Sequence, residues 1–372
     1  MKHDPGLASW LQLTLTPGLG PSALRSMLRQ FGLPQAVLAR RPSELSPFAS
    51  PAALDALHSD AVREAVARAL AWLDAPQRWL TTLADDNYPR ALLEIPDPPA
   101  VLYLQGRLDL LQQPALAIVG SRNATAQGES NAQGFARSLG DAGLTIVSGL
   151  ALGIDAAAHR GGLASASSTI AVLGTGIDIV YPRGNVALAE EIGSRGLLLS
   201  EFPLGTAAAT HNFPRRNRLI SGLSRGCLVI EAALASGSLI TARAAAEQGR
   251  EVFAVPGSIH SPLSKGCHAL IKSGAKLVES AEDVLSELSG FRPSGYASTA
   301  TAAVAGASTA SLEGSGLLAH MGHDPVDVDA LCSRAGMSPE QVSSELLRLE
   351  LDGRVTALPG GLYQRLEKSR RA

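Results

Sequence analysis

The sequence predicts an α/β fold built on a doubly wound, mostly parallel sheet. Short apolar runs rich in β-branched residues recur along the chain, and each leads through a turn into a helical stretch of about ten or more residues. Strands and helices that alternate in this way form βαβ units with helices on both faces of the sheet. We therefore expect an extended Rossmann-like core, with a small helical domain before it and a winged-helix domain after it.

Residues 1–75 are expected to form the N-terminal helical domain, of the SAM or helix-hairpin-helix type. The segment from Thr16 to Pro21 is rich in glycine and proline and separates two helical patterns. Backbone amides of a helical hairpin can hold a phosphate, and a tight turn between two packed helices explains the same segment equally well.

Residues 80–289 are expected to form the Rossmann-like core. Its predicted strands are the apolar runs 115–119, 144–147, 169–173, 197–200, 227–230 and 252–255. A parallel α/β sheet binds its ligands outside the carboxyl ends of the strands, where the glycines and polar residues after these runs lie. Several turns therefore converge on one crevice.

The turn Gly120-Ser121-Arg122 is the most informative of them. A glycine lets the main chain turn sharply, and the free amides at the start of the following helix favour an anion. No G-x-G-x-x-G follows Gly120, so the dinucleotide fingerprint is absent. A phosphate site beside Arg122 is one interpretation, and an ordinary turn with a solvated arginine is the other.

A local basic cluster supports the phosphate interpretation. Residues 213–218 read Phe-Pro-Arg-Arg-Asn-Arg, and we expect a helix that has Pro214 as its first residue. Arginines in a first helical turn oppose the helix dipole, which suggests an anion between them, and the aromatic ring can stack on a base. Arg183, after Tyr181-Pro182, and Lys265 are expected to add cations. A solvated basic turn is the plainer alternative.

The composition excludes several other classes of protein. The formal net charge is −2, so a site for a polyanion must be local. The three cysteines lack C-x-x-C spacing and indicate buried thiols of a reducing compartment, with no disulfide or metal framework. No apolar run approaches the roughly 20 residues of a membrane span, and no signal-peptide core is present. We expect a cytoplasmic protein without a membrane, metal or cofactor partner.

The C-terminal part of the chain differs in composition from the core. Residues 290–311 are rich in Ala, Ser, Thr and Gly and are expected to form a flexible linker. Residues 312–368 combine helical patterns with a hairpin, which indicates a winged helix. From Glu313 to Asp352 there are eight acidic residues and two arginines. This balance favours contact with a protein, although many winged helices read duplex DNA.

Seven motifs in order resemble those of the DprA/Smf family, over about Tyr88 to Glu287. They are Ile118–Arg122, Ser148–Asp155 with His159, Leu173–Gly176, Tyr181–Arg183, Phe213–Arg218, Ser236–Thr241 and Val255–Gly257. Members of this family are DNA-processing proteins of natural transformation, which bind and shield incoming single-stranded DNA and help to load the RecA recombinase. The resemblance implies a recombination mediator of this kind, acting as a homodimer and without enzymatic activity.

The resemblance also implies a set of DNA contacts. They are Ser121, Arg122, Arg183, Phe213, Arg216, Asn217 and Arg218. The backbone around them would be shaped by Gly149, Gly174, Gly176 and Gly237, and Ser238 and Lys265 complete the expected site. We expect the four arginines to line one pocket at the carboxyl edge of the sheet. Family members often have lysine at the position of Arg183, and this exchange keeps the charge.

The dimer is expected at the end of the core. The helix 242–248 is rich in alanine around Ala246, and small residues allow a second subunit to approach closely. The short strand 276–278, which contains Leu277, would leave a sheet edge that needs cover.

Two other functions remain open. Asp155, His159 and Glu231 could serve acid–base chemistry, as in the Rossmann-like phosphoribohydrolases, although residues 231–238 lack that family's double glycine and catalytic glutamate. We expect structural roles instead: Asp155 as a helix cap, His159 as a satisfied buried histidine and Glu231 as the partner of an arginine. The other alternative is a duplex-binding regulator that acts through the winged helix.

Overall fold

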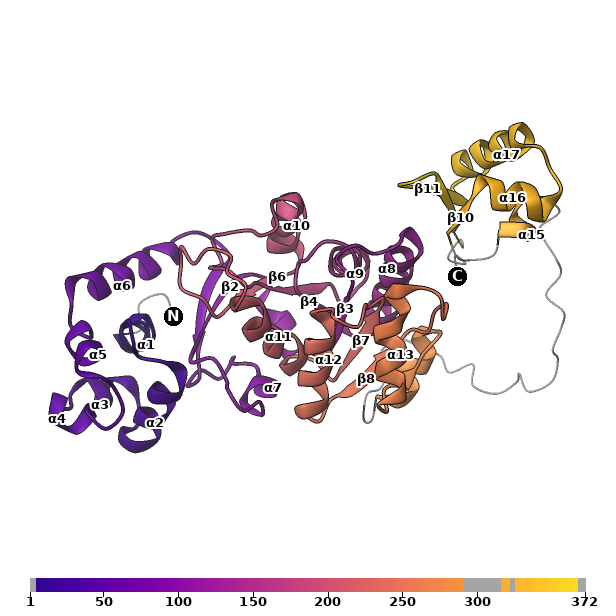
Figure 1. Cartoon of the computed structure of the whole chain (residues 1–372). Coiled ribbons are helices and arrows are strands. Elements are labelled where there is room, and N and C mark those ends of the chain that lie inside the picture. The colour runs from indigo at the N-terminus through magenta and orange to yellow at the C-terminus, as the bar shows by residue number, and fades with distance from the viewer. Residues whose placement is uncertain (1–4, 289, 291–315, 322–324, 367–372) are drawn as a thin grey trace.

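A computed structural model describes residues 5–288, 290, 316–321 and 325–366. The predicted α/β core, helical N-terminal domain and winged helix are all present. The N-terminal helices lie at one end of the central sheet and the winged helix at the other (Figure 1). Of the expected linker 290–311, every residue except Gly290 lies outside the described residues.

Short helices that begin at prolines dominate the N-terminal domain. The side chains of Ser50 and Ser59 cap the last two helices. Trp10 and Trp72 pack with Tyr103 of the sheet and attach this domain to the core. The helices are α1 (Pro5–Leu15), α2 (Pro21–Phe31), α3 (Pro34–Leu38), α4 (Pro42–Leu45), α5 (Pro51–Ala56) and α6 (Asp60–Trp72).

The core sheet has the order β1-β2-β6-β5-β4-β3-β7-β8-β9. Strands β1 and β2 are antiparallel additions, and the pairs from β6 to β9 are parallel. The chain leaves β3 toward one edge and later returns beside it as β7, so the topological switch point lies between these two strands. The strands are β1 (Arg78–Thr82), β2 (Val101–Gly106), β3 (Ala115–Gly120), β4 (Thr145–Ser148), β5 (Thr169–Val172), β6 (Leu197–Ser200), β7 (Gly226–Ile230), β8 (Glu251–Ala254) and β9 (Lys276–Leu277).

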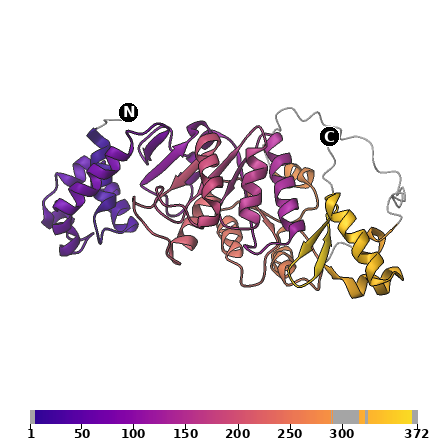
Figure 2. The ribbon, with the colours of Figure 1, turned by 90° about the horizontal axis from the view of Figure 1, so that it is seen from above.

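Helices cover both faces of the sheet, as Figure 2 shows from above. In β3, Ala117 and Val119 pack with α7, α11, α12 and α13, whereas Leu116 and Ile118 pack with α8, α9 and α14 on the other face. The helices are α7 (Arg90–Leu93), α8 (Ala126–Asp141), α9 (Ile154–Leu163), α10 (Val186–Arg195), α11 (Asn212–Gly222), α12 (Ser238–Glu247), α13 (Lys265–Lys272) and α14 (Ala281–Glu287), with 3₁₀ turns η1 (Leu108–Gln112), η2 (Arg183–Asn185) and η3 (Pro262–Ser264).

Strand β9 is one edge of the core sheet. It pairs only with β8 among the described strands, and Leu277 is 50% exposed. Ala246, on α12, is also exposed. These are the two residues expected at a dimer interface, and both are accessible in the single chain.

The winged helix has the predicted order of three helices and a hairpin. Its three-stranded sheet has the order β10-β12-β11. Its elements are α15 (Leu318–Met321), β10 (Val326–Asp327), α16 (Val328–Ala335), α17 (Pro339–Leu351), β11 (Val355–Leu358) and β12 (Leu362–Arg365). Across the described segments of the whole chain, no helix combines the length and apolar character of a membrane span.

Candidate functional site

The predicted turn after β3 lies at the topological switch point. A Cβ on Gly120 would lie 1.9 Å from the Ile230 carbonyl oxygen, so only glycine fits between β3 and β7. The Ser121 amide donates to the Glu231 carbonyl oxygen at 2.7 Å, and the Ser121 hydroxyl accepts from the Asn123 amide at 3.2 Å. The turn is therefore fixed to the neighbouring strand end, and it holds Arg122 at the surface.

A cavity of about 600 Å³ opens beside this turn, and we call it the crevice cavity. Its lining comes from the turn after β3, the start of α11 and the segment before α12, so the predicted convergence of separate turns is confirmed. Of the expected site residues, it brings together Ser121, Arg122, Phe213, Arg216, Asn217, Gly237 and Ser238.

An exposed arginine and two aromatic rings form one wall of the crevice cavity. The Arg122 guanidinium lies 5.8 Å from the centre of the Phe213 ring, and the Tyr181 ring lies 5.6 Å from the same ring. Within the described chain, Arg122 makes no salt bridge. Tyr181 is 48% exposed. This wall therefore offers an unpaired cation and an accessible stacking face.

Arg216 forms the floor of the crevice cavity and is 5% exposed. Its guanidinium donates to the carbonyl oxygen of Gly149, at 2.6 Å, and to that of Val172, so it joins the ends of β4 and β5. Burial lowers the pKa of Arg216 to about 10, and the neighbouring Asp155 opposes this shift. The Arg216 Nε donates to the Asn217 side-chain oxygen at 3.1 Å. Because these hydrogen bonds are all made within the protein, Arg216 holds the cavity lining in place more than it presents a free cation.

Two of the expected glycines make room for the site side chains. A Cβ on Gly149 would lie 2.6 Å from the Arg216 guanidinium, and a Cβ on Gly174 would lie 2.8 Å from the Phe213 ring. Gly176 is different, because its Cβ would meet Asp178 and the Pro203 carbonyl oxygen outside the crevice cavity. Gly237 would meet no atom within 4 Å.

The start of α12 also lines the crevice cavity. Gly237 is the N-cap and provides no side chain to the first amides of the helix. The Ser236 and Ser238 hydroxyl groups lie 2.7 Å apart at this helix end. The Ser238 amide donates to the Ser236 hydroxyl at 3.3 Å and the Leu239 amide to the Ser236 carbonyl oxygen at 3.1 Å, so the groups that this helix end offers to a phosphate oxygen are the hydroxyls.

Asp155 differs from its expected role as a helix cap. Gly153 is the N-cap of α9, and the Asp155 carboxylate instead accepts hydrogen bonds from the amides of Gly149, at 3.1 Å, and Ala151, at 3.4 Å. Burial raises the pKa of the Asp155 carboxyl, whereas Arg216 and the two amides oppose the shift. The side chain thus holds the loop between β4 and α9 in place.

His159 is a satisfied buried histidine, as expected. Its Nε2 accepts a hydrogen bond from the Leu150 amide at 3.2 Å, and its Nδ1 lies 2.8 Å from the Thr169 hydroxyl. Since the Thr169 hydroxyl donates to the Ile146 carbonyl oxygen, it accepts from Nδ1–H, and the ring is neutral. Burial lowers the pKa of His159 to about 3.

The expectation that Glu231 pairs with an arginine is wrong. Its carboxylate accepts hydrogen bonds from the Thr125 amide, at 2.8 Å, and from the Thr125 hydroxyl, at 2.5 Å. Thr125 is the N-cap of α8, so the acidic group complements the positive end of that helix.

The expectation that four arginines line one pocket is wrong for Arg218. Arg216 and Arg218 are two positions apart on α11, so they face nearly opposite sides of the helix. Arg218 is directed away from the crevice cavity and contacts the Glu201 carboxylate at 2.5 Å and Asp97 at 3.5 Å. Burial raises the pKa of the Glu201 carboxyl, and Arg218 and Arg215 oppose the shift.

Arg183 and Lys265 also lie outside the lining of the crevice cavity. Arg183 is exposed at the start of η2, and the Lys265 ammonium donates to the Ile259 carbonyl oxygen. Tyr181, from the same motif as Arg183, does line the cavity and was not among the predicted site residues. The signal that could have identified Tyr181 is a second aromatic side chain in a site already predicted to use the Phe213 ring for stacking. α11 begins at Asn212, two residues before the predicted first residue Pro214.

Residues 79–289 match the family model described as DNA recombination-mediator protein A, and residues 300–361 match the one described as the DprA winged helix domain. The chain belongs to the DNA recombination-mediator protein A family. The predicted DprA/Smf resemblance is thereby confirmed, and the first match contains the whole crevice cavity.

Two curated relatives of the chain match different lengths of it. Protein Smf of Escherichia coli (strain K12) is 43% identical over 309 residues, which cover 82% of each chain. DNA processing protein DprA of Streptococcus pneumoniae (strain ATCC BAA-255 / R6) is 50% identical over 206 residues, 55% of this chain and 73% of that protein.

Two solved structures of DNA processing protein A share the fold. The one from Streptococcus pneumoniae has a TM-score of 0.64 and 39% identity, and the match covers 77% of this chain and 99% of that one. The one from Helicobacter pylori has a TM-score of 0.51 and 32% identity, and covers 55% of this chain and 93% of that one. The latter structure concerns the single-stranded DNA binding mode of the Helicobacter protein.

Proposed function

We propose that this chain binds single-stranded DNA in the crevice cavity and acts as a recombination mediator during natural transformation. The observation that carries the proposal is the placement of the unpaired Arg122 guanidinium beside the Phe213 and Tyr181 rings, in a cavity that is also lined by Ser236 and Ser238. A phosphate is bound by a cation and by hydroxyl donors, and an unstacked base is bound by an aromatic face. One cavity offers both.

The same geometry favours a single strand over a duplex. Bases in a duplex are stacked on one another and cannot reach the Phe213 and Tyr181 rings, whereas the bases of a single strand can. Binding through phosphate and stacking is tolerant of sequence, which suits a protein that handles incoming DNA of any sequence. The Helicobacter relative with single-stranded DNA supports this choice.

The proposal includes assembly and partners. A homodimer would cover Leu277 on the β9 edge and Ala246 on α12, which are both exposed in the single chain. In this proposal the dimer acts in the cytoplasm, shields the strand and helps to load RecA onto it. The family membership supports these roles.

We further propose that the chain acts without catalysis. The carboxylates of Asp155 and Glu231 and the ring of His159 are all engaged in hydrogen bonds to neighbouring backbone or threonine groups. A general acid or base must be free to exchange a proton with a substrate, and each of these groups is held by these hydrogen bonds. The nucleotide-processing alternative has less support for this reason.

The winged helix is proposed to contact protein. The exposed side of α17, the helix that would enter a major groove, carries Leu347 at 59% exposure, Leu351 at 82%, and the exposed carboxylates of Glu340 and Glu350. DNA phosphates require cations at such a surface. The chain truncated after Ser311 should therefore keep its single-strand affinity, and a large loss in a folded truncation would favour a duplex reader.

One titration series separates the three functions. Purified protein is mixed with a labelled single strand, the matching duplex and nucleoside monophosphates, and products are analysed. The proposal expects tightest binding to the single strand and unchanged nucleotides. Preferential duplex binding would favour the regulator, and hydrolysis of a monophosphate would favour the enzyme.

A further inference from the structure

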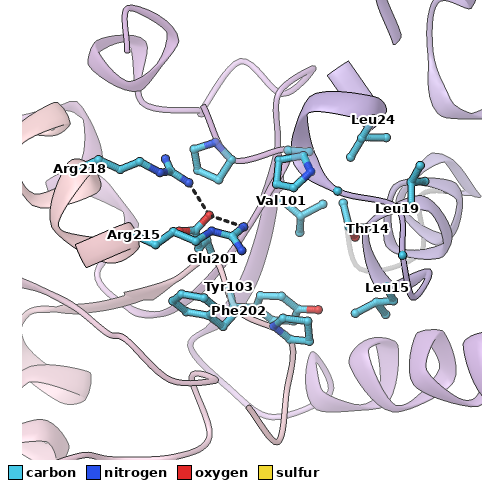
Figure 3. A pocket seen from close by; sticks show the side chains of 16 residues that line it. Thr14, Leu15, Leu19, Leu24, Val101, Tyr103, Glu201, Phe202, Arg215 and Arg218 are labelled. Carbon is cyan, nitrogen blue, oxygen red and sulfur yellow. Dashed lines mark hydrogen bonds and ion pairs between the residues drawn. The ribbon is translucent and has the colours of Figure 1, made fainter. Parts of the chain in front are cut away.

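A second cavity, of about 420 Å³, lies between the N-terminal helical domain and the core, and we call it the hairpin cavity (Figure 3). It is formed by the segment between α1 and α2, by β2, by the residues after β6 and by one side of α11. The crevice cavity lies on the other side of α11, and the two share no lining residue. Its volume falls within the range of small-molecule sites.

The hairpin cavity has an unsatisfied polar group in its wall. Tyr103 is 2% exposed, and its hydroxyl has no hydrogen-bond partner in the described chain. Figure 3 shows this hydroxyl directed away from the core strands, toward Leu15 of α1. A buried hydroxyl without a partner is unfavourable, so in a cavity wall it is a group that a ligand atom or a water can satisfy.

The same cavity offers groups for an anion. α2 begins at Pro21 after the N-cap Gly20, which provides no side-chain cap, and both residues line the cavity. The amides of Ser22 and Ala23 have no acceptor among the residues that the structure describes. Arg215 reaches across the cavity, with one contact to Glu201 at 3.2 Å and with 42% of its side chain exposed.

Most of the other lining side chains are apolar and suit a flat ring, and the polar exceptions are Thr14 and the Arg218–Glu201 ion pair. The Arg215 guanidinium lies 5.4 Å from the centre of the Phe202 ring, which makes a cationic and aromatic surface. The other apolar walls are Leu15, Leu19, Pro21, Leu24, Pro99, Val101 and Pro203. An anion site beside an apolar slot matches a nucleotide, which joins a phosphate to a planar base.

We propose that the hairpin cavity binds one nucleotide, with the phosphate at the start of α2 and Arg215, and the base against the apolar walls within reach of the Tyr103 hydroxyl. This inference deepens the proposed function, and it rests on that function if the nucleotide belongs to a bound DNA strand. The nucleotide is either part of a strand that crosses α11 from the crevice cavity, or a free mononucleotide. In this proposal the segment from Thr16 to Pro21 holds a phosphate and is more than a tight turn between packed helices.

Gly20→Asp is the decisive variant. Gly20 has φ −73° and ψ 162°, and a Cβ there would meet no atom within 4 Å. Aspartate is a favourable N-cap, so the fold is preserved while a carboxylate occupies the amides and repels phosphate. Gly20→Asn is the matched control, because it caps the helix without the charge. Tyr103→Phe removes only the unsatisfied hydroxyl.

The full chain is titrated with dAMP, with deoxyadenosine, and with labelled single strands of about 6 and about 20 nucleotides. We expect Gly20→Asp to weaken dAMP binding about tenfold, clearly more than Gly20→Asn, and to leave deoxyadenosine unchanged. Tyr103→Phe should weaken dAMP and deoxyadenosine binding about threefold to tenfold without lowering thermal stability.

The strands identify the source of the nucleotide. If Gly20→Asp weakens the binding of the longer DNA strand but not of the shorter one, the hairpin cavity holds a nucleotide of the bound strand. If Gly20→Asp weakens only the binding of dAMP, the cavity holds a free mononucleotide. Arg122→Ala should weaken the binding of both DNA strands and leave dAMP binding at the hairpin cavity intact. A failure of the proposed function can therefore be distinguished from a failure of this inference. Unchanged binding of dAMP and of both strands in Gly20→Asp and Tyr103→Phe would overturn the inference.

Discussion

The Arg216 guanidinium donates a hydrogen bond to the Gly149 carbonyl oxygen at 2.6 Å, and a Cβ on Gly149 would lie within 2.6 Å of the same guanidinium. The two residues therefore depend on each other. The arginine satisfies the end of β4 only because residue 149 has no side chain. Since Arg216 also donates to the Val172 carbonyl oxygen, this pair fixes the relative positions of two strand ends beneath the crevice cavity.

Gly149→Ala should displace Arg216 and break its bonds to the main chain. We expect the free energy of unfolding to fall by about 1–3 kcal/mol, because a buried side chain is forced from its partners. Denaturant unfolding measures the change. Gly237→Ala is the control, since its Cβ would meet no atom within 4 Å, and should alter stability by about 0.5 kcal/mol or less. Equal effects of the two variants would contradict the account.

Arg218→Ala should lower the free energy of unfolding. The substitution leaves the Glu201 side chain, which is 2% exposed, with Arg215 as its remaining cation at 3.2 Å. A buried carboxylate that loses its closest partner destabilises a protein by about 3 kcal/mol. Adding Glu201→Gln should restore part of the loss in a double-mutant cycle. A loss of under about 1 kcal/mol would show that the pair is not important for folding.

His159 should make the fold sensitive to acid. Its pKa is lowered to about 3 in the folded chain from 6.5, so below pH 6.5 the unfolded chain gains a proton that the folded chain does not. The free energy of unfolding therefore falls as the pH drops from 6.5 toward 3, by about 1.4 kcal/mol per pH unit from this group.

His159→Gln tests this dependence, because glutamine does not titrate and all other histidines are unchanged. Between pH 7 and pH 5 the wild-type chain should lose about 2 kcal/mol more than the variant. Parallel curves for the two proteins would show that the pKa of His159 is not lowered in the fold.

Leu277→Arg should convert the proposed dimer to monomers. The side chain is 50% exposed at the β9 edge, and an arginine there would place two like charges across a two-fold interface. Light scattering measures the mass. Leu93→Arg, at 52% exposure on α7, is the matched control and should leave the mass unchanged. A Leu277→Arg protein that stays dimeric would place the interface elsewhere.

The fold was predictable because its signals are local. Apolar runs such as 115–119 and 227–230, each followed by a turn, were recognisable as strands from the sequence alone. The turns after them converge because parallel strands end at one edge of the sheet. The grouping of Ser121, Arg122 and Phe213 followed from that rule.

The rest of the site could not be predicted, because it depends on which side of a helix a residue faces and on partners that are distant in the sequence. Arg218 was expected beside Arg216, but two positions on a helix differ by about 200°. Its partner Glu201 follows β6, and no local pattern joins the two residues. Likewise, the hydrogen bonds of Glu231 to Thr125 link positions that are far apart in the chain, so the sequence alone suggested an arginine partner instead.

The salt dependence of single-strand binding tests the central claim most directly. Arg122→Ala is compared with Arg137→Ala, which removes an equal charge from the far end of α8 at 67% exposure. If Arg122 contacts phosphate in the crevice cavity, its removal should weaken binding and reduce the slope of log K against log salt by about 0.7, while Arg137→Ala leaves both unchanged. An unchanged slope and affinity for folded Arg122→Ala would contradict the assignment of the crevice cavity as the DNA site.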